Sequence, residues 1–404
     1  MEKIRIIENG GVTTAKGFET AGIYCGIRKK KKDIAIIKSD NPAALAAVFT
    51  QNKTIAAPVI ISKRKFANSK TCTAIVVNSG NANACTGECG MIDAERMVSA
   101  TAKALNVPPN EVIIASTGVI GQFLPIENIE SGIAQLATLL SPNGSDDAAE
   151  AIMTTDTFAK TIAVSFSIAG KEVTIGGIAK GSGMIEPNMA TMLAFITSDA
   201  NIAQPLLQKT FFSAIARSFN RISVDGDTST NDMAVMLANG ASGTPEIIAG
   251  TPEYKLFSQA LLQVTTELAK MIARDGEGAT KLIEISVGGA MTEDEALKVA
   301  RSIGNSNLVK TAIHGEDPNW GRIIAAIGYS GVDLDPEFIE LSMNTYPVLG
   351  KKYHIVIDES LVQPSLKQKD ILLSVNLNRG EKAANFWTCD LTKEYININA
   401  SYRS

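Results

Sequence analysis

Histidine is scarce in this chain, with two histidines, His314 and His354, among 404 residues. His354 lies in an apolar pattern at 353–357, which is typical of a structural residue in a strand. His314 lies in a polar loop that is able to serve a site. Neither residue belongs to a Ser-His-Asp pattern, and the G-x-S-x-G turn of serine hydrolases is missing. The sequence therefore disfavours a nucleophile that is activated by a histidine.

Cysteine is also sparse, and the number of cysteines, five, is odd. This count fits a reducing compartment better than a framework of disulfides. Cys85 and Cys89 have the spacing of a pair of metal ligands, but no second pair and no nearby histidine accompany them. We therefore expect no zinc site, and no residue is assigned as a metal ligand.

Positive charge is not in excess, because 38 Lys and Arg residues stand against 42 Asp and Glu residues. This balance argues against a nucleic-acid partner. The one dense basic cluster, 28–32, is interpreted as a solvated loop. No run approaches the roughly 20 apolar residues of a membrane span, and the first residues have no apolar signal core. We expect a soluble, cytoplasmic protein with no membrane partner.

The composition is that of a globular protein, with 45% hydrophobic and 20% charged residues. Strand and helix patterns alternate, and 161–168 and 172–178 predict a hairpin with its turn at Ala169-Gly170. Beyond about residue 334 the pattern is mainly that of strands, 394–399 included. Together these patterns predict an α/β protein with much antiparallel sheet and a possible structural boundary near residue 285.

A glycine-rich segment, 180–189, precedes the small-residue junction Ala190-Thr191 and an apolar run. It is not a phosphate loop, because the closing Gly-Lys-Ser/Thr is missing. If the chain were cut before Thr191, the freed α-amino group, with an ordinary pKa near ~7.7–8.0, would lie beside the hydroxyl. One residue would then supply both nucleophile and base. The alternative is that Ala190 and Thr191 are simply the start of a buried strand.

A second polar loop, 225–232, holds three aspartates in eight residues. Such oxygens suit calcium or magnesium, although the loop lacks the closing Glu of an EF-hand. The alternative is a self-hydrogen-bonded turn that supports a neighbouring site, and the sequence favours this interpretation.

The chain resembles the ornithine acetyltransferase (glutamate N-acetyltransferase) family of arginine biosynthesis. The resemblance is carried in order by eight segments, 78–84, 116–121, 153–157, 180–193, 225–232, 274–280, 317–322 and 398–404. These segments span nearly the whole chain, so the match is far more specific than one short motif.

The resemblance implies an N-terminal-nucleophile-like αββα sandwich with a smaller C-terminal α/β domain. It also implies self-cleavage between Ala190 and Thr191, giving an α chain of 1–190 and a β chain of 191–404. The two fragments are expected to remain associated, as a heterotetramer of two α and two β chains.

The resemblance further assigns the residues of the site. Thr191 is the nucleophile, and Thr117 and Gly118 supply the oxyanion hole. Substrate is bound by Thr157, Lys180, Thr191, Glu277, Asn399 and Ser404. The family often ends in threonine where this chain has Ser404, which keeps the hydroxyl. No cofactor is expected.

The implied reaction moves an acetyl group from N2-acetylornithine to glutamate through an acetyl ester on Thr191. Acetyl-CoA is a possible second donor, and no feature of the sequence separates the two versions. A related N-terminal-nucleophile aminopeptidase or amidase, in which water takes the acyl group, is the alternative from another class. An uncleaved small-molecule binding protein is the third.

Overall fold

The computed structural model describes residues 4–186 and 192–401. The predicted cleavage residues Ala190 and Thr191, and the terminal Ser404, lie outside the described residues. The chain divides into two compact units. The first comprises Met1–Asn220 and Asp227–Ile272, and the second comprises Arg221–Gly226 and Ala273–Ser404.

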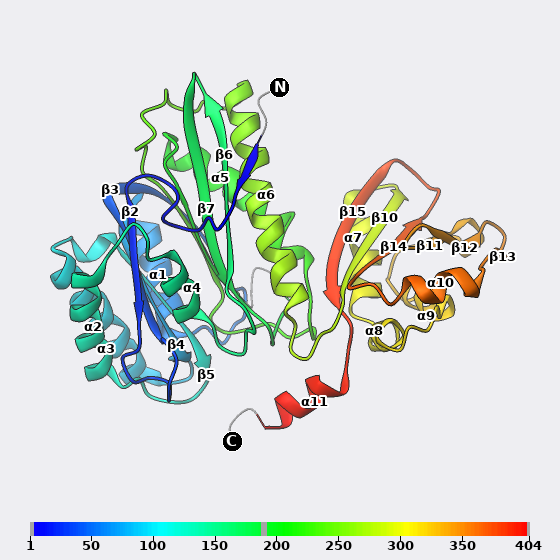
Figure 1. The fold of residues 1–404 in the computed structure, drawn as a ribbon, viewed down its shortest axis with the longest axis horizontal. Helices are drawn as coiled ribbons and strands as arrows, with labels where there is room; N and C mark the ends of the chain where they lie inside the picture. Colours follow the sequence, from blue (N-terminus) through cyan, green and yellow to red (C-terminus); the bar gives the residue numbers. More distant parts are fainter. Residues whose placement is uncertain (1–3, 187–191, 402–404) are drawn as a thin grey trace. The chain divides into compact units, whose positions relative to one another are not determined.

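The first unit is built on a nine-stranded mixed sheet (Figure 1). The strand order is β1-β6-β7-β8-β9-β3-β4-β5, with β2 paired to β3. The pairs β4/β5 and β8/β9 are parallel and the others antiparallel. The strands are β1 (Arg5–Ile7), β2 (Phe18–Ile23), β3 (Ile34–Phe49), β4 (Thr71–Asn81), β5 (Val112–Val119), β6 (Lys160–Ile168), β7 (Lys171–Lys180), β8 (Leu193–Ser198) and β9 (Met233–Ala238).

The long strand β3 joins two halves of this sheet, because its first part pairs with β2 and its last part with β9. Alternate residues of a strand point to opposite faces. Ala35 and Ile37 belong to one buried cluster with Phe195 and Val235 of the other half, so the two half-sheets pack on each other. The short helix α4 (Ser145–Ile152) contributes to the same core.

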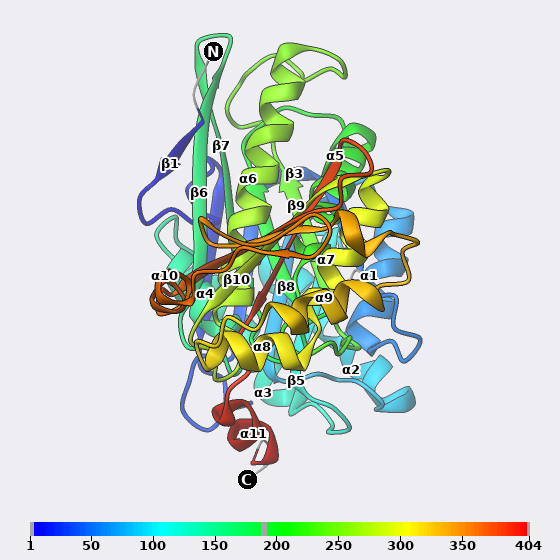
Figure 2. The same cartoon turned by 90° about the vertical axis from the view of Figure 1, so that its right-hand side faces the viewer.

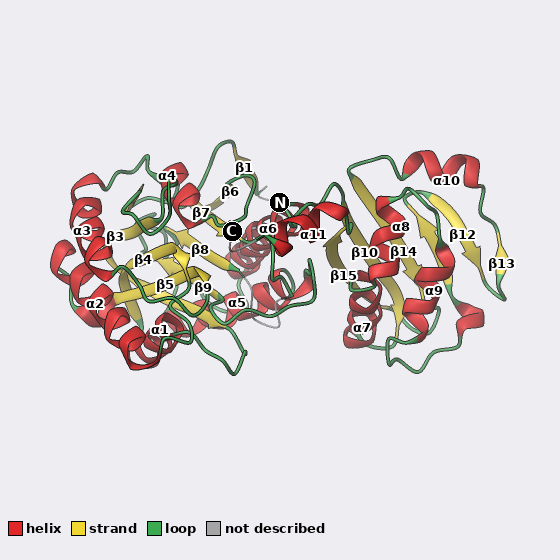
Figure 3. Cartoon of the chain, turned by 90° about the horizontal axis from the view of Figure 1, so that it is seen from below, coloured by secondary structure: helices red, strands yellow, loops and turns green. Residues whose placement is uncertain are grey.

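Helices cover the outer faces of both half-sheets (Figure 3). Ile34 and Ile36 pack with residues of α1 (Ala57–Asn68), α2 (Gly87–Leu105) and α3 (Ile126–Leu139). On the other half, α5 (Gln204–Ala216) contacts β3, and the side chains of α6 (Pro252–Arg274) lie against Gly177. Two 3₁₀ turns, η1 (Pro109–Glu111) and η2 (Phe219–Arg221), complete the elements. This layering confirms the predicted αββα sandwich.

The strands of the sandwich are interleaved along the chain. The strands β6 and β7 form a hairpin, visible along its length in Figure 2, and the predicted turn at Ala169-Gly170 joins them. Next in the sheet come β8 and β9, which follow residue 191 in sequence, and then β3, which precedes it. The two strands after the expected cleavage point therefore lie between strands that come before it.

The second unit is a smaller α/β fold on a six-stranded sheet, which confirms the predicted class of the C-terminal domain. The strand order is β13-β12-β11-β14-β10-β15. The strands are β10 (Leu282–Ala290), β11 (Glu340–Met343), β12 (Tyr346–Gly350), β13 (His354–Ile355), β14 (Asp370–Asn376) and β15 (Lys382–Cys389). The helices are α7 (Glu293–Gly304), α8 (Asn307–His314), α9 (Trp320–Gly328), η3 (Pro336–Phe338), α10 (Glu359–Ser365) and α11 (Lys393–Ala400).

Two sequence expectations for this unit differ from the structure. Residues 394–399, predicted as a strand, lie in the helix α11, because the Thr392 hydroxyl accepts a hydrogen bond from the Glu394 N–H and starts a helix there. The boundary expected near residue 285 falls inside β10, whereas the division in the chain comes at Ala273. Among the described residues, no helix is long and apolar enough to cross a bilayer.

Candidate active site

Thr117 and Gly118 lie at the carboxyl end of β5, beside the equivalent end of the parallel strand β4. Gly118 has φ +133°, and a Cβ there would lie 2.3 Å from the backbone carbon of Gly80. A side chain therefore does not fit at this position, and the sequence meets that requirement with glycine. The end of β5 therefore has its backbone in close contact with the neighbouring strand β4.

Buried amides and hydroxyls hold this end of β5 in place. The Ser116 hydroxyl donates to the Asn78 side-chain oxygen at 2.5 Å. The Asn231 side-chain amide donates to the carbonyls of Ala82 and Ser116 at 2.6 and 2.9 Å. All three side chains that make these bonds are at least 96% buried. The residue before Thr117 is therefore fixed from two directions.

Asn231 comes from the aspartate-rich loop 225–232, which the sequence left open as a cation site or a supporting turn. In the same loop, the Ser229 carbonyl accepts a hydrogen bond from the Thr50 hydroxyl, and the Thr230 carbonyl accepts one from the Ala56 N–H. These bonds fix the loop, and Asn231 of the loop supports the end of β5. Over the described ranges 4–186 and 192–401, no group of three His, Cys, Asp or Glu residues is placed to hold a metal ion.

Lys180 ends strand β7 and reaches Thr117. Its Nζ donates a hydrogen bond to the Thr117 Oγ1 at 3.4 Å, and the lysine is 7% exposed. A hydroxyl has one proton to donate and two lone pairs. By accepting from the ammonium, the Thr117 hydroxyl keeps its own proton for another acceptor. The structure thus brings together two of the predicted site residues.

A buried ion cluster lies next to this lysine. The Asp156 Oδ1 accepts hydrogen bonds from the Lys160 Nζ and from the Gly181 N–H, both at 2.7 Å. Both charged side chains of this pair are fully buried. Burial by itself raises the pKa of the Asp156 carboxyl, but the positive charges of Lys180 and Lys160 outweigh it and hold the pKa well below its ordinary value.

Sequence reasoning gave no role to Asp156 or Lys160, although Asp156 lies in one of the family segments. The available signal was the pair of opposite charges four residues apart, with no other charged residue between Glu150 and Lys171. The predicted substrate residue Thr157 follows Asp156 directly and is exposed. Asp156 therefore connects the segment that holds Thr157 with the segment that holds Lys180.

The expected nucleophile falls between two well-fixed neighbours in the sequence. Lys180 of β7 is the register partner of Leu193 in β8. The Met192 carbonyl accepts a hydrogen bond from the Met233 N–H at 3.1 Å. Strand β7 therefore ends beside the residue at which β8 begins. The positions of Ala190 and Thr191 themselves lie outside the described residues.

The remaining predicted residues belong to the second unit. The Asn399 side-chain amide of α11 donates to the Glu277 Oε2 at 2.8 Å, and Glu277 is 7% exposed. The structure brings these two residues together, while Ser404 is not described. The histidine that the sequence left open, His314, lies 3.0 Å from the Asp390 carboxylate through its Nδ1. His354, interpreted as structural, is exposed on β13.

Comparison with known proteins places these residues in a family. The ArgJ family model matches residues 19–404. The chain is 48% identical over 402 residues to the arginine biosynthesis bifunctional protein ArgJ of Caldanaerobacter subterraneus, covering 98% of this chain and 100% of that protein. It is 51% identical over 403 residues to the ArgJ protein of Dehalococcoides mccartyi, covering 99% and 98%.

Two solved structures are also similar in sequence. The crystal structure of ArgJ from Bacillus halodurans is 43% identical, with a TM-score of 0.45, covering 48% of this chain and 99% of that one. The ornithine acetyltransferase of Mycobacterium tuberculosis, solved with ornithine, is 36% identical, with a TM-score of 0.44, covering 47% and 100%. The family that the motifs predicted is confirmed by the family model and the full-length relatives: this chain belongs to the ArgJ family.

Proposed function

We propose that this protein is a glutamate N-acetyltransferase, which moves the acetyl group of N2-acetylornithine to glutamate through an ester on Thr191. Membership of the family supports the predicted class, an acyltransferase of arginine biosynthesis. The relative from Mycobacterium tuberculosis, solved with ornithine, supports a small amino-acid substrate. The observation that carries the proposal is the hydrogen bond from Lys180 to Thr117, which joins the lysine proposed to bind substrate to the proposed oxyanion donor.

The enzyme activates itself by cutting the chain between Ala190 and Thr191. The Thr191 Oγ attacks the Ala190 carbonyl carbon, the C–N bond breaks, and the resulting ester is hydrolysed by water. The new α-amino group has an ordinary pKa of ~7.7–8.0, so at neutral pH a fraction is unprotonated and takes the hydroxyl proton. No histidine is required, in agreement with the position of His314 beside Asp390 and of His354 on the exposed strand β13.

Acetyl transfer then begins with attack of Thr191 Oγ on the acetyl carbonyl of acetylornithine. The tetrahedral oxyanion accepts hydrogen bonds from the Thr117 hydroxyl and the Gly118 N–H, which are fixed donors. The ammonium of Lys180 increases the donor strength of the Thr117 hydroxyl, because hydrogen bonds in a chain polarise one another. Proton transfer to the leaving nitrogen releases ornithine and leaves the acetyl ester.

Glutamate is the second substrate. Its amine attacks the ester carbon, the Thr191 Oγ leaves and recovers a proton, and N-acetylglutamate is released. Lys180 pairs with the α-carboxylate that both substrates share, and Thr157 lies on the adjoining segment. Glu277 meets the ornithine ammonium, and Asn399 and Ser404 are assigned to substrate binding with it. Two half-reactions through one covalent intermediate predict ping-pong kinetics.

The strand order supports a stable association of the two fragments. Strands β8 and β9 of the proposed β chain pair with β7 and β3 of the proposed α chain. The fragments therefore share one sheet, and we propose that two such αβ pairs form the heterotetramer. The biosynthetic role and the free cysteines support a cytoplasmic location.

The relatives are named bifunctional, which favours acetyl-CoA as a second acetyl donor. The reaction would enter the same cycle, with Thr191 attacking the thioester carbon and the thiol leaving. An aminopeptidase or amidase would share the ester but pass it to water. The acceptor of the acetyl group therefore separates the transferase from the hydrolase.

Mass spectrometry of the intact fragments tests the proposal. The purified protein is mixed briefly with acetylornithine, acetyl-CoA or neither, and quenched in acid. We expect the fragment that starts at Thr191 to gain one acetyl group with acetylornithine and to lose it on addition of glutamate. Gain with acetyl-CoA would establish the second donor. Thr191→Ala is the control that removes the hydroxyl, and Thr191→Ser keeps it.

Three results would contradict the proposal in different ways. A single uncut band of about 42.8 kDa in active preparations would exclude self-cleavage. Full turnover without an acetylated fragment would exclude the covalent mechanism. Loss of the acetyl group to water at the same rate with and without glutamate would identify a hydrolase.

A further inference from the structure

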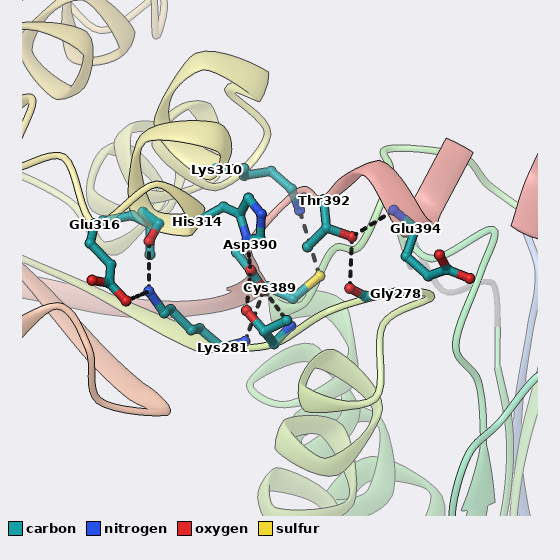
Figure 4. A network of polar contacts seen from close by, with 11 residues as sticks. Gly278, Lys281, Lys310, His314, Glu316, Cys389, Asp390, Thr392 and Glu394 are labelled. Atoms are coloured by element: carbon teal, nitrogen blue, oxygen red, sulfur yellow. Dashed lines mark hydrogen bonds and ion pairs between the residues drawn. The ribbon is translucent and has the colours of Figure 1, made fainter. Parts of the chain in front are cut away.

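The Glu277–Asn399 pair depends on the position of a helix that buries very little. None of the residues of α11 is buried, and Ile396 on it is 66% exposed. A helix of eight residues has little stability of its own, so its place must come from specific contacts. Contacts with other residues of the second unit supply it, and part of the network is shown in Figure 4.

The first of these contacts is made by Thr392. Its hydroxyl donates to the Gly278 carbonyl at 2.8 Å and accepts from the Glu394 N–H at 3.1 Å. The same side chain therefore caps α11 and ties its start to the residue after Glu277 (Figure 4). Thr392 is 8% exposed, so water competes little with these bonds.

Gly278 packs directly against the first turn of α11. It has φ +70°, and a Cβ there would lie 2.7 Å from the Tyr395 nitrogen. The Tyr395 hydroxyl donates to the Asp225 Oδ2 at 3.3 Å, and the Asn399 amide then reaches Glu277 one turn further on. The helix thus touches the 276–281 segment at its start and near its end.

Asp390 fixes the 276–281 segment on which α11 rests. Its Oδ1 accepts from the N–H groups of Thr280 and Lys281 at 2.7 and 2.8 Å. Its Oδ2 accepts from the Thr280 hydroxyl at 2.6 Å and lies 3.0 Å from His314 Nδ1. The carboxylate is 2% exposed, and four partners compensate for its burial.

We propose that Asp390 and Thr392 are positioning residues for substrate binding. Asp390 fixes the segment that carries Glu277, and Thr392 fixes the helix that carries Asn399, so the two together set the distance between Glu277 and Asn399. The consequence for substrate rests on the proposed function, in which this pair contacts acetylornithine. Neither residue takes part in the chemistry.

Steady-state kinetics of Thr392→Ala and Thr392→Ser test this role. Removal of the hydroxyl is expected to raise the KM for acetylornithine about 3- to 10-fold, which corresponds to one hydrogen bond, with a smaller change in kcat. Thr392→Ser keeps the hydroxyl and is expected to restore the KM. Thr292→Ala is the matched control, because Thr292 also caps a helix of this unit, accepting from the Glu295 N–H at 3.1 Å.

A double variant separates positioning from general loss of structure. If Thr392 acts through Asn399, Thr392→Ala adds almost nothing to the KM of Asn399→Ala. A full additive effect, or a KM of Thr392→Ala no higher than that of Thr292→Ala, would overturn the inference. Asp390→Asn, which keeps the size of the side chain, is expected to raise the same KM.

Hydrogen exchange of the peptide 393–400 distinguishes failure of this inference from failure of the proposed function. We expect faster exchange of this peptide in Thr392→Ala than in the unmodified protein or in Thr292→Ala. If the unmodified protein transfers no acetyl group, the proposed function fails while faster exchange still supports the positioning of α11. Unchanged exchange would exclude positioning whatever the activity.

Discussion

The ammonium of Lys180 donates a hydrogen bond to the hydroxyl of Thr117, 63 residues away in sequence. Lys180 is held in turn by the charge of Asp156, the carboxylate that also accepts from Lys160 and Gly181. One buried carboxylate therefore organises the cation that meets the proposed oxyanion donor.

Replacement of Thr117 by valine is expected to lower kcat for acetyl transfer about 10²- to 10³-fold, because one donor to the oxyanion is lost. Thr117→Ser keeps the donor and should retain most of the activity. The rates are measured on the cleaved fraction quantified by denaturing electrophoresis, so that a cleavage defect is not counted as a catalytic one. Thr138→Val, at an exposed threonine of α3, is the control. A normal kcat in Thr117→Val would exclude the role.

Asp156→Asn is expected to lower the free energy of unfolding by about 3–5 kcal/mol, because it leaves the buried ammonium of Lys160 without its counter-charge. Urea unfolding followed by circular dichroism measures the change. Asp147→Asn removes the carboxylate of an exposed pair with Lys32 and should cost less than about 1 kcal/mol. Equal effects of the two substitutions would show that burial of the Asp156 pair has no energetic importance.

Asp156 also predicts how stability depends on pH. Its pKa lies below the ordinary value of 3.8, so the unfolded chain binds the proton more readily than the folded one. The stabilisation is therefore complete well above pH 3.8 and is lost as the pH falls through and below that value. Unfolding free energies measured across this range should decline more steeply in the unmodified protein than in Asp156→Asn. Parallel curves would contradict the prediction.

Gly118→Ala and Gly121→Ala separate crowding from backbone conformation. Both glycines have positive φ, but a Cβ at 118 meets the backbone of Gly80, whereas nothing lies within 4 Å of a Cβ at 121. We expect a loss of about 2–4 kcal/mol for Gly118→Ala and about 1 kcal/mol for Gly121→Ala, measured by urea unfolding. The reverse order would show that the turn after β5 relaxes easily.

The cysteines should divide sharply in reactivity. Cys85 and Cys89 are exposed, while Cys72 and Cys389 are buried. Burial raises the pKa of Cys72 to about 12 and also raises that of Cys389, so neither forms thiolate at neutral pH. Brief alkylation of the native protein, mapped by peptide mass spectrometry, is expected to label Cys85 and Cys89, and the buried pair only after unfolding. Rapid labelling of Cys72 would contradict the packing around β4.

Local sequence patterns predicted the elements whose residues alternate cleanly or carry a turn signal, such as the hairpin at Ala169-Gly170. They failed at α11, where Ile396-Asn-Ile-Asn399 alternates like a strand. The helix forms because Thr392 caps it and Gly278 leaves space for its first turn. Thr392 lies before the alternating stretch, and Gly278 is distant in sequence, so the local alternation reveals neither cause.

At the candidate site, too, the sequence did not reveal contacts between residues that are distant in the chain. Thr117, Lys180, Glu277 and Asn399 were predicted from the family resemblance, and the structure pairs them as Lys180 with Thr117 and Asn399 with Glu277. Asp156 was not given a role, because its importance comes from the convergence of β7 with the segment before β6. Charge spacing alone does not distinguish a buried ion pair from a solvated one.

The interleaved strand order has a consequence for the refolding of the protein before and after cleavage. An intact chain folds with β8 and β9 connected to β7, so their insertion between β7 and β3 is a reaction within one molecule. If the bond before Thr191 is cut, as proposed, the same insertion requires two separate chains to meet. Renaturation of denatured, processed enzyme would then become concentration-dependent, while the uncut precursor would renature at a rate independent of dilution. The proposed cleavage would convert a fold that one chain can regain alone into one that two chains must meet to form.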